Sequence, residues 1–293
     1  MRKSPVFLAL LAAFVCAVAL GAHTPAGAEA PSPLRHYLVL GLDYYAVNAS
    51  SSARSDTILL ITLDPGGNRI LFTSILRDSK VTTPGGGENK LNSVFANYGL
   101  EGAKSTVERH LGVSVEGVIA IDFETVKELI DAFGGVDIEI SLQEYRWIHS
   151  ILLGKDPNMP QGPGVAHMTG RIALAYMRDR HSGGSDFSRT EHQRKVLVQL
   201  MEKASLLSLP DMLHLFNEIS GKVRTDMGPR QMLTALQTAY LLKNAQVTEH
   251  RVPADRTYVY DTLRGSSVLS VRWKLNRELF QDLLYPPAEG AEP

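Results

Sequence analysis

Short apolar runs of strand length recur in the first half of the chain, each beside charged or turn-forming residues. The runs at residues 36–42, 57–63 and 69–75 read HYLVLGL, TILLITL and RILFTSI. A continuous apolar run such as the second is typical of a strand buried on both faces of a sheet. The sequence DPGGN at residues 64–68 is a turn signal, after which the chain returns as the third strand.

Helical patterns alternate with further strands along the rest of the chain. Strands are predicted at residues 117–123 and 136–140, and a strand pair at 248–253 and 258–260. Helices are predicted at residues 101–110, 122–133, 168–176, 189–207, 210–219, 229–245 and near 271–284, with a loop at 154–164. This alternation predicts an α/β fold, a single domain with a central mixed β-sheet flanked by helices.

The first thirty residues have the composition of a targeting segment. Arg2 and Lys3 precede an uncharged, mostly apolar stretch at residues 5–22, and small residues then lead to Ala28-Glu29-Ala30. This order is typical of an export signal, and the apolar stretch is also near the lower length limit of a spanning helix. We therefore expect residues 1–30 to be a cleaved export signal or a short membrane anchor. Residues 31–285 are then an exported domain, and residues 286–293 a flexible tail.

Composition excludes several classes of function. The 293 residues are 44% hydrophobic, enough for a full core, and the formal net charge of −1 gives no overall field that would attract nucleic acid. The single cysteine, Cys16, lies in the N-terminal apolar stretch, which excludes disulfide frameworks, CxxC zinc sites and a cysteine nucleophile in the domain. GxxxxGK[ST], GxSxG and HExxH motifs are also absent. The histidines lack zinc-binding spacing, and Tyr176 ends an apolar helical stripe, so we interpret it as core rather than as a general base.

Three arginines and a glutamine gather around a glycine-containing loop at residues 178–193. Arg178 and Arg180, two residues apart in a segment expected to be extended, would point the same way. Arg189 and Gln193 share the helix face that continues into an apolar stripe, where a buried cation needs a partner. One such arginine would usually pair with a structural aspartate. Three of them together favour an anion site, because guanidinium groups make forked contacts with phosphate.

Charged residues also stand at the ends of the first three predicted strands. Asp43 follows the first strand and Asp56 begins the second, so antiparallel pairing would bring the two carboxylates to one sheet edge. Two solvated turn aspartates are the alternative. Carboxylates and the cations Arg77 and Lys90 belong in one anion site if a divalent metal lies between them. This combination indicates phosphoryl transfer, which needs mainly positioning and charge neutralisation.

An ordered set of short motifs resembles the LytR-CpsA-Psr family of bacterial envelope proteins. The matching pieces cover most of the chain after the export signal: LVLGLD (38–43), RSDTILLITLDP (54–65), ILRD (75–78), KLN (90–92), GVIAIDF through FGGVDI (117–138), HMTGRIALAYMRDR (167–180) and DFSRTEHQ (186–193). Leu76 departs from the pattern, because the family usually has proline there.

The resemblance implies a phosphotransferase that moves a glycopolymer from a polyprenyl-pyrophosphate carrier onto a cell-wall acceptor, usually peptidoglycan. The enzyme would work at the outer side of the cytoplasmic membrane, in the periplasm or cell wall, near its lipid substrate. Asp43 and Asp56 match the positions that deal with Mg²⁺ (or Mn²⁺). The positions that hold the pyrophosphate match Arg77, Lys90, Arg178, Arg180, Arg189 and Gln193. Asp56, Arg77 and Arg189 are the expected catalytic residues.

Two other functions fit the same residues. A polyprenyl-pyrophosphate hydrolase would pass the phosphoryl group to water, and the sequence does not separate it from the transferase. A non-catalytic regulatory module would bind an isoprenoid phosphate without turnover, although pure anion binding gains nothing from Asp43 and Asp56. An apolar pocket for the prenyl tail is implied by the resemblance, but its lining residues do not stand out from the core.

Overall fold

The computed structural model describes residues 34–42, 54–179, 206–242 and 245–285, together with residues 192, 195–196, 199–200 and 202–204. Outside this part lie the predicted export signal or anchor, the predicted tail, about half of the predicted helix at 189–207, and the site residues Asp43, Arg180, Arg189 and Gln193. Among the described residues, no helix has both the length and the apolar composition that crossing a membrane requires.

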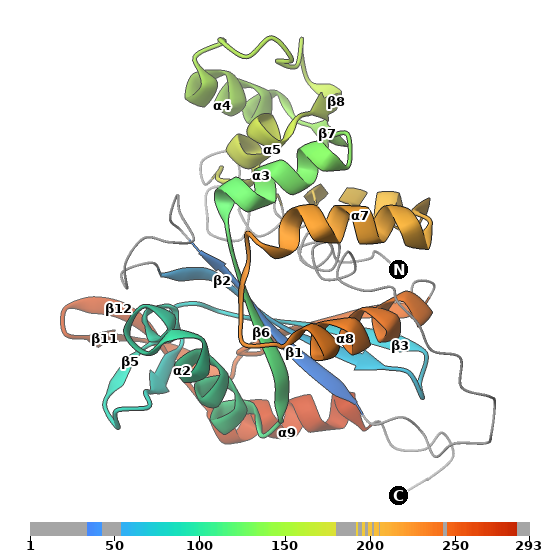
Figure 1. Cartoon of the computed structure of the whole chain (residues 1–293). Helices are drawn as coiled ribbons and strands as arrows, with labels where there is room; N and C mark the ends of the chain where they lie inside the picture. The colour runs from blue at the N-terminus through green and yellow to red at the C-terminus, as the bar shows by residue number, and fades with distance from the viewer. Residues whose placement is uncertain are drawn as a thin grey trace, which may run out of the picture.

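A six-stranded mixed sheet lies at the centre of the molecule (Figure 1). Its order is β10-β3-β2-β1-β6-β9, with β1 (Arg35–Leu42) antiparallel to β2 (Ser55–Asp64) and parallel to β6 (Val115–Asp122). On one side β3 (Arg69–Ile75) is antiparallel to β2 and parallel to β10 (Gln246–Val252), and on the other β9 (Arg224–Thr225) is antiparallel to β6. The mixed sheet confirms the predicted fold class.

Alternate side chains of the central strands face two different helical layers. On β1, Tyr37 and Val39 pack in one hydrophobic cluster while Leu38 and Leu40 pack in the other, and all four are buried. The first cluster includes α3 (Phe123–Ala132), α4 (Leu142–Leu152), α5 (Gly170–Met177), α7 (Leu209–Ser220) and α8 (Pro229–Leu241). The second includes α2 (Val94–Leu111) and α9 (Trp273–Leu284). Because both faces are covered, the strands read as continuous apolar runs rather than as alternating ones.

Two small hairpins lie beside the central sheet and frame the cavity described below. The first pairs β4 (Lys80–Thr82) with β5 (Glu88–Lys90), and the short helix η1 (Leu91–Ser93) follows it. The second pairs β11 (Tyr258–Leu263) with β12 (Ser266–Val271). A third pair, β7 (Val136–Ile140) with β8 (Gly164–Met168), belongs to the group of elements around α4 and α5 drawn at the top of Figure 1.

Local capping residues explain several helix boundaries. The Asp122 carboxylate accepts a hydrogen bond from the Thr125 N–H at 2.9 Å and starts α3, and Gly134 and Gly135 follow its end with φ of 71° and 80°. Ser141 and Glu144 form a capping box that starts α4, a helix that the apolar pattern does not predict.

The predicted strand pair at 248–253 and 258–260 is wrong. β10 joins β3 in the central sheet, whereas β11 pairs with β12. The turn between β11 and β12 is Arg264-Gly265, with φ of 50° and 79°. Positive φ at both residues is typical of the type I′ turn that suits two-residue hairpins. Val271 therefore ends a strand instead of beginning the last helix, which starts at Trp273.

Candidate functional site

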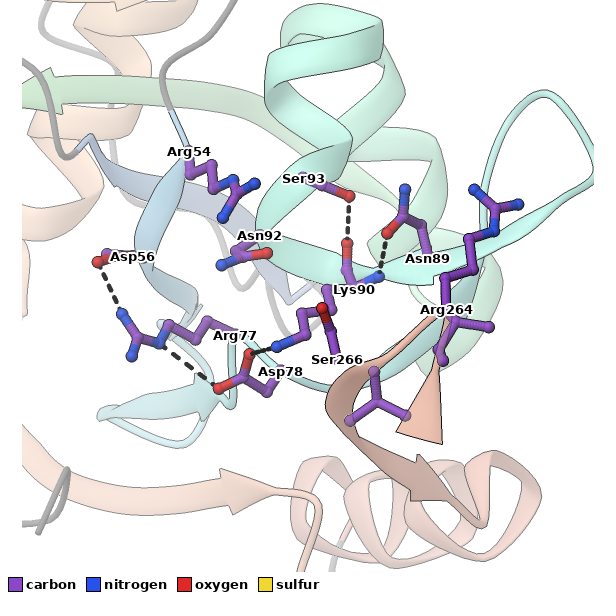
Figure 2. Close-up of a pocket in the computed structure, with 12 residues that line it drawn as sticks. Arg54, Asp56, Arg77, Asp78, Asn89, Lys90, Asn92, Ser93, Arg264 and Ser266 are labelled. Carbon is purple, nitrogen blue, oxygen red and sulfur yellow. Dashed lines mark hydrogen bonds and ion pairs between the residues drawn. The ribbon is translucent and has the colours of Figure 1, made fainter. Parts of the chain in front are cut away.

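A polar cavity of about 650 Å³ lies where the start of β2, the end of β3 and the two small hairpins meet (Figure 2). Ten of its twelve lining residues are polar: the cations Arg54, Arg77, Lys90 and Arg264, the aspartates Asp56 and Asp78, and the neutral residues Asn89, Asn92, Ser93 and Ser266. Leu263 and Val268 are the two apolar ones. Such a lining suits a charged head group or a sugar rather than a hydrocarbon chain.

Four of the charged side chains form a chain of alternating sign through the cavity. Arg77 Nη1 lies 2.7 Å from Asp56 Oδ2, and Arg77 Nε lies 3.7 Å from Asp78 Oδ2. Lys90 Nζ then lies 2.7 Å from Asp78 Oδ1. All four side chains are partly exposed, between 15% and 37%. They are therefore within reach of a ligand and already held in place by one another.

Backbone hydrogen bonds fix this segment to three other parts of the fold. The Leu76 N–H donates to the Val252 carbonyl of β10 at 2.7 Å, and the Asn92 N–H donates to the Arg77 carbonyl at 3.0 Å. The Leu269 N–H donates to the Asp78 carbonyl at 2.9 Å, which attaches β12. Leu76 stands where the family usually has proline, and proline could not make the first of these bonds.

The cavity lining carries a surplus of positive charge. Four cations and two carboxylates give a formal charge of +2 (4 − 2) over the twelve lining residues. Because Asp56 and Asp78 are both paired within the chain of charges, the surplus lies with Arg54 and Arg264. A polar cavity with this balance is suited to an anion that carries more than one charge.

The structure brings three of the predicted site residues together and places a fourth elsewhere. Asp56, Arg77 and Lys90 line the cavity, whereas Arg178 does not. Arg178 caps the end of α5 with a helical backbone (φ −93°, ψ −2°), and its guanidinium carbon lies 5.1 Å from the centroid of the Phe123 ring. The predicted extended conformation of Arg178 is therefore wrong, because the helical backbone runs one residue further.

The predicted antiparallel pairing of the first two strands is confirmed. Leu42, the residue before Asp43, is the partner of Ser55, the residue before Asp56. Asp43 itself, with Arg180, Arg189 and Gln193, lies outside the described residues, so its approach to Asp56 remains a prediction.

Several cavity residues were missed by sequence reasoning. Arg264 is the first residue of the hairpin turn, Ser266 follows the turn, and Asn89 lies on β5. Arg264-Gly265 is a local turn signal, but the signal does not reveal which part of the fold the hairpin contacts. A sequence separation of nearly two hundred residues from Arg77 hides that neighbourhood.

A second charged group lies buried between α4, α5 and residue 192. His192 Nε2 is 2.8 Å from Glu144 Oε1, and the two side chains are 5% and 8% exposed. The Tyr176 hydroxyl donates to the same oxygen at 3.3 Å, and the Tyr176 and His192 rings lie 4.4 Å apart. Burial alone would raise the pKa of Glu144, but hydrogen bonds from His192 and Ser141 hold that pKa at about 2. Tyr176 is fully buried, which confirms its interpretation as a core residue.

The described residues supply only part of the ligands that the predicted metal site needs. The described residues contain no group of three His, Cys, Asp or Glu side chains placed to hold a metal ion. Asp56 and Asp78 nevertheless lie in one cavity. Mg²⁺ commonly binds through one or two carboxylates and completes its shell with water and phosphate oxygens. The metal therefore remains a prediction, in which a phosphate ligand and water would complete the donor set.

Comparison with known proteins identifies the family of this chain. Residues 33–282 match the sequence model of the LytR_cpsA_psr family. The chain belongs to the LytR-CpsA-Psr family. Among its LytR-CpsA-Psr relatives, the polyisoprenyl-teichoic acid–peptidoglycan teichoic acid transferase TagU of Enterococcus faecalis is 30% identical over 193 residues, which are 65% of this chain and 60% of the relative. TagU of Bacillus anthracis is 31% identical over 223 residues, 74% of this chain and 68% of the relative.

Solved structures of the family share the fold. The LytR-CPS2A-psr family protein YwtF (TagT), solved with bound octaprenyl pyrophosphate lipid, superposes with a TM-score of 0.64 and 21% sequence identity. The superposition covers 86% of this chain and 90% of that one. The central mixed sheet and its helical layers are thus those of a LytR-CpsA-Psr domain.

Proposed function

We propose that this LytR-CpsA-Psr protein transfers a glycopolymer from a polyprenyl-pyrophosphate carrier onto peptidoglycan or a similar cell-wall acceptor. The observation that carries the proposal is the polar cavity with the alternating charges of Asp56, Arg77, Asp78 and Lys90. The transferase names of the relatives and the lipid pyrophosphate bound by a protein of the same fold support it. The reaction takes place at the outer side of the cytoplasmic membrane.

The proposed step is the displacement of one phosphate ester by another. The oxygen of the acceptor hydroxyl attacks the sugar-side phosphorus, and the bond from that phosphorus to the bridging oxygen breaks. Polyprenyl monophosphate leaves with the bridging oxygen, and the sugar phosphate becomes joined to the acceptor. Asp56 or Asp43 assists the attacking hydroxyl, a role that competes with metal binding, while Arg77 and Lys90 stabilise the charge that develops on the phosphate oxygens.

Mg²⁺ (or Mn²⁺) is part of the proposal, held by Asp56 and by Asp43. When bound, the ion would neutralise pyrophosphate oxygens and lower the barrier to displacement. Arg178, Arg180, Arg189 and Gln193 remain proposed pyrophosphate ligands on the basis of the family resemblance. Arg178 would have to act from the end of α5, since it does not line the described cavity.

The decisive experiment follows the fate of both halves of the donor. The purified chain is incubated with Mg²⁺, a polyprenyl-pyrophosphate oligosaccharide and peptidoglycan fragments, and mass spectrometry follows polyprenyl monophosphate and modified fragments. Release of the lipid with sugar phosphate joined to the fragment supports the transferase. Release without joining supports hydrolysis, and bound but unchanged lipid supports a binding module.

Arg77→Ala tests the charge chain directly. We expect turnover to fall about a hundredfold or more, the usual effect of removing one donor to a developing oxyanion. Arg256→Ala, at an exposed turn away from the cavity, is the control for loss of an arginine and should keep wild-type turnover. Wild-type turnover in Arg77→Ala would remove this residue from the site.

A further inference from the structure

Arg264 reaches the cavity from the tip of the β11–β12 hairpin. It is exposed and lines the cavity together with Asn89 of β5 and Ser266 across the turn. Figure 2 draws Arg54 and Asp56 toward one side of this cavity and Arg264 toward the other. The chain of alternating charges begins at Asp56 and ends at Lys90, which lies on the Arg264 side of the cavity.

Arg264 forms no ion pair that would stabilise the described part of the fold. No hydrogen bond or ion pair joins its guanidinium to another described residue, whereas Arg77 and Lys90 both contact aspartates. Its backbone also takes a positive φ of 50°, a conformation that side chains other than glycine, asparagine and aspartate rarely adopt. An arginine is thus a poor choice for the turn, and among the described residues its charge has no partner.

The cavity is larger than a pyrophosphate group needs. Its volume of about 650 Å³ falls in the range of roughly 300–1,000 Å³ that is usual for pockets holding a whole small-molecule ligand. Its lining is polar throughout, apart from Leu263 and Val268, so the additional space suits the glycan rather than the prenyl tail. The part of the donor that extends toward Arg264 is therefore expected to be sugar.

We propose that Arg264, with Asn89 and Ser266, forms a second anion subsite that binds a phosphate or carboxylate carried by the glycan itself. The inference rests on the proposed function, which places a glycan in this cavity. Arg264 supplies the charge and a forked donor, and Asn89 and Ser266 supply neutral hydrogen bonds. The hairpin therefore selects donors whose transferred polymer is anionic.

The test uses direct binding by the full chain and does not depend on turnover. The probes are a soluble oligomer of glycerol phosphate, a neutral oligosaccharide of matched length, and octaprenyl pyrophosphate. The variant is Arg264→Asn, because Asn-Gly is the preferred pair for a type I′ turn and the hairpin should be kept. The matched control is Arg256→Asn, which removes a second exposed arginine with positive φ that does not line the cavity.

We expect Arg264→Asn to weaken binding of the glycerol-phosphate oligomer about tenfold and to leave octaprenyl pyrophosphate binding within about twofold of wild type. Arg256→Asn should bind all probes like the wild type, and the neutral oligosaccharide should not distinguish the proteins. The subsite is overturned if the wild type does not bind the oligomer, if Arg264→Asn binds it as tightly, or if the variant loses octaprenyl pyrophosphate equally.

Activity separates this inference from the proposed function. With a turning-over enzyme, Arg264→Asn should raise KM for a donor with an anionic glycan while kcat, and KM for a neutral donor, stay unchanged. An equal rise in KM for both donors would overturn selection by charge. If the binding pattern holds but the wild type consumes neither donor, the subsite stands and the proposed transfer reaction fails.

Discussion

The carboxylate of Glu144 makes four contacts at once, the longest of them with Lys195 Nζ at 3.7 Å. One oxygen accepts the Ser141 N–H at 2.6 Å and completes the capping box of α4, while the other faces His192 at 2.8 Å and the Tyr176 hydroxyl at 3.3 Å. Buried charges need partners of this kind. Glu144 thereby connects two helices to residue 192, the neighbour in sequence of the proposed ligand Gln193.

Replacing Glu144 by alanine should therefore cost about 3 kcal/mol of unfolding free energy, because it removes the buried carboxylate that His192 and Tyr176 both contact. Urea unfolding measures the loss. Glu139→Ala removes an exposed glutamate from neighbouring β7 and should change the free energy by less than about 0.5 kcal/mol. Equal effects of the two substitutions would show that the buried pair contributes no more than a surface charge.

Residues that begin or end a strand could be predicted as site residues from sequence alone. Asp56 and Arg77 were found because charges at the ends of apolar runs are expected to gather at one edge of a sheet, whereas Lys90 was assigned to the site by its match to the family pattern. Arg264 could not be found in this way, since its hairpin is brought to the cavity by tertiary contacts, among them the Leu269–Asp78 backbone bond and the Lys80–Asp261 ion pair, that leave no local pattern. Arg178 was misplaced because a local pattern does not fix the last residue of a helix.

At the scale of elements, the segment after β3 is bonded to β10 and leads directly into the cavity. The Leu76 N–H bonds to Val252 of β10, and the next two residues are Arg77 and Asp78 of the cavity. The family pattern has proline at this position. This chain uses an N–H there, so its β3–β10 connection includes a hydrogen bond that a proline would lack.

Leu76→Pro should thus destabilise the protein by about 1–3 kcal/mol, through loss of the donor and an unsatisfied Val252 carbonyl. Thermal unfolding is the measurement. Leu76→Ala retains the N–H, and its half-buried side chain contributes only through packing, so the proline variant should be the less stable of the two. A proline variant as stable as wild type would show that this bond is dispensable.

The order of the elements was largely predictable, whereas their pairing was predictable only for β1 with β2. Apolar runs located β1, β2, β3, β6 and β7, because their length and bounding turns are strong local signals. The partner of β10 was assigned wrongly, since parallel pairing with β3 joins residues about 180 positions apart and leaves no local pattern. α4 was not predicted, although the Ser141 and Glu144 capping box is present in the sequence.

At the scale of the whole molecule, buried histidines set the response to acid. Burial lowers the pKa of His36 to about 4 and also lowers the pKa of His110 and His250. Because the folded pKa lies below the unfolded value of 6.5, the neutral form is favoured in the folded state. The associated stability is fully present above about pH 6.5 and is lost as pH falls toward the folded pKa.

His36 is the sharpest test, since it is 6% exposed and contacts the Thr62 hydroxyl at 2.8 Å. Between about pH 7 and about pH 4 its protonation should remove roughly 3 kcal/mol of unfolding free energy. His36→Gln should flatten the dependence of that free energy on pH, measured by urea unfolding across this range. His214→Gln changes a histidine that is 78% exposed and should leave the slope as it is. An unchanged slope in His36→Gln would contradict the assignment.

The position of β10 has a consequence for the order in which the chain can fold. β3 is bounded by β2 on one side, and its other edge stays open until residues 246–252 have been made and have joined it. The layer that includes α9 is completed later still. A nascent or truncated chain therefore presents an apolar, unpaired strand edge, the feature that recruits other chains into aggregates. More than four fifths of this polypeptide must therefore be synthesised before β10 can cover the edge of β3.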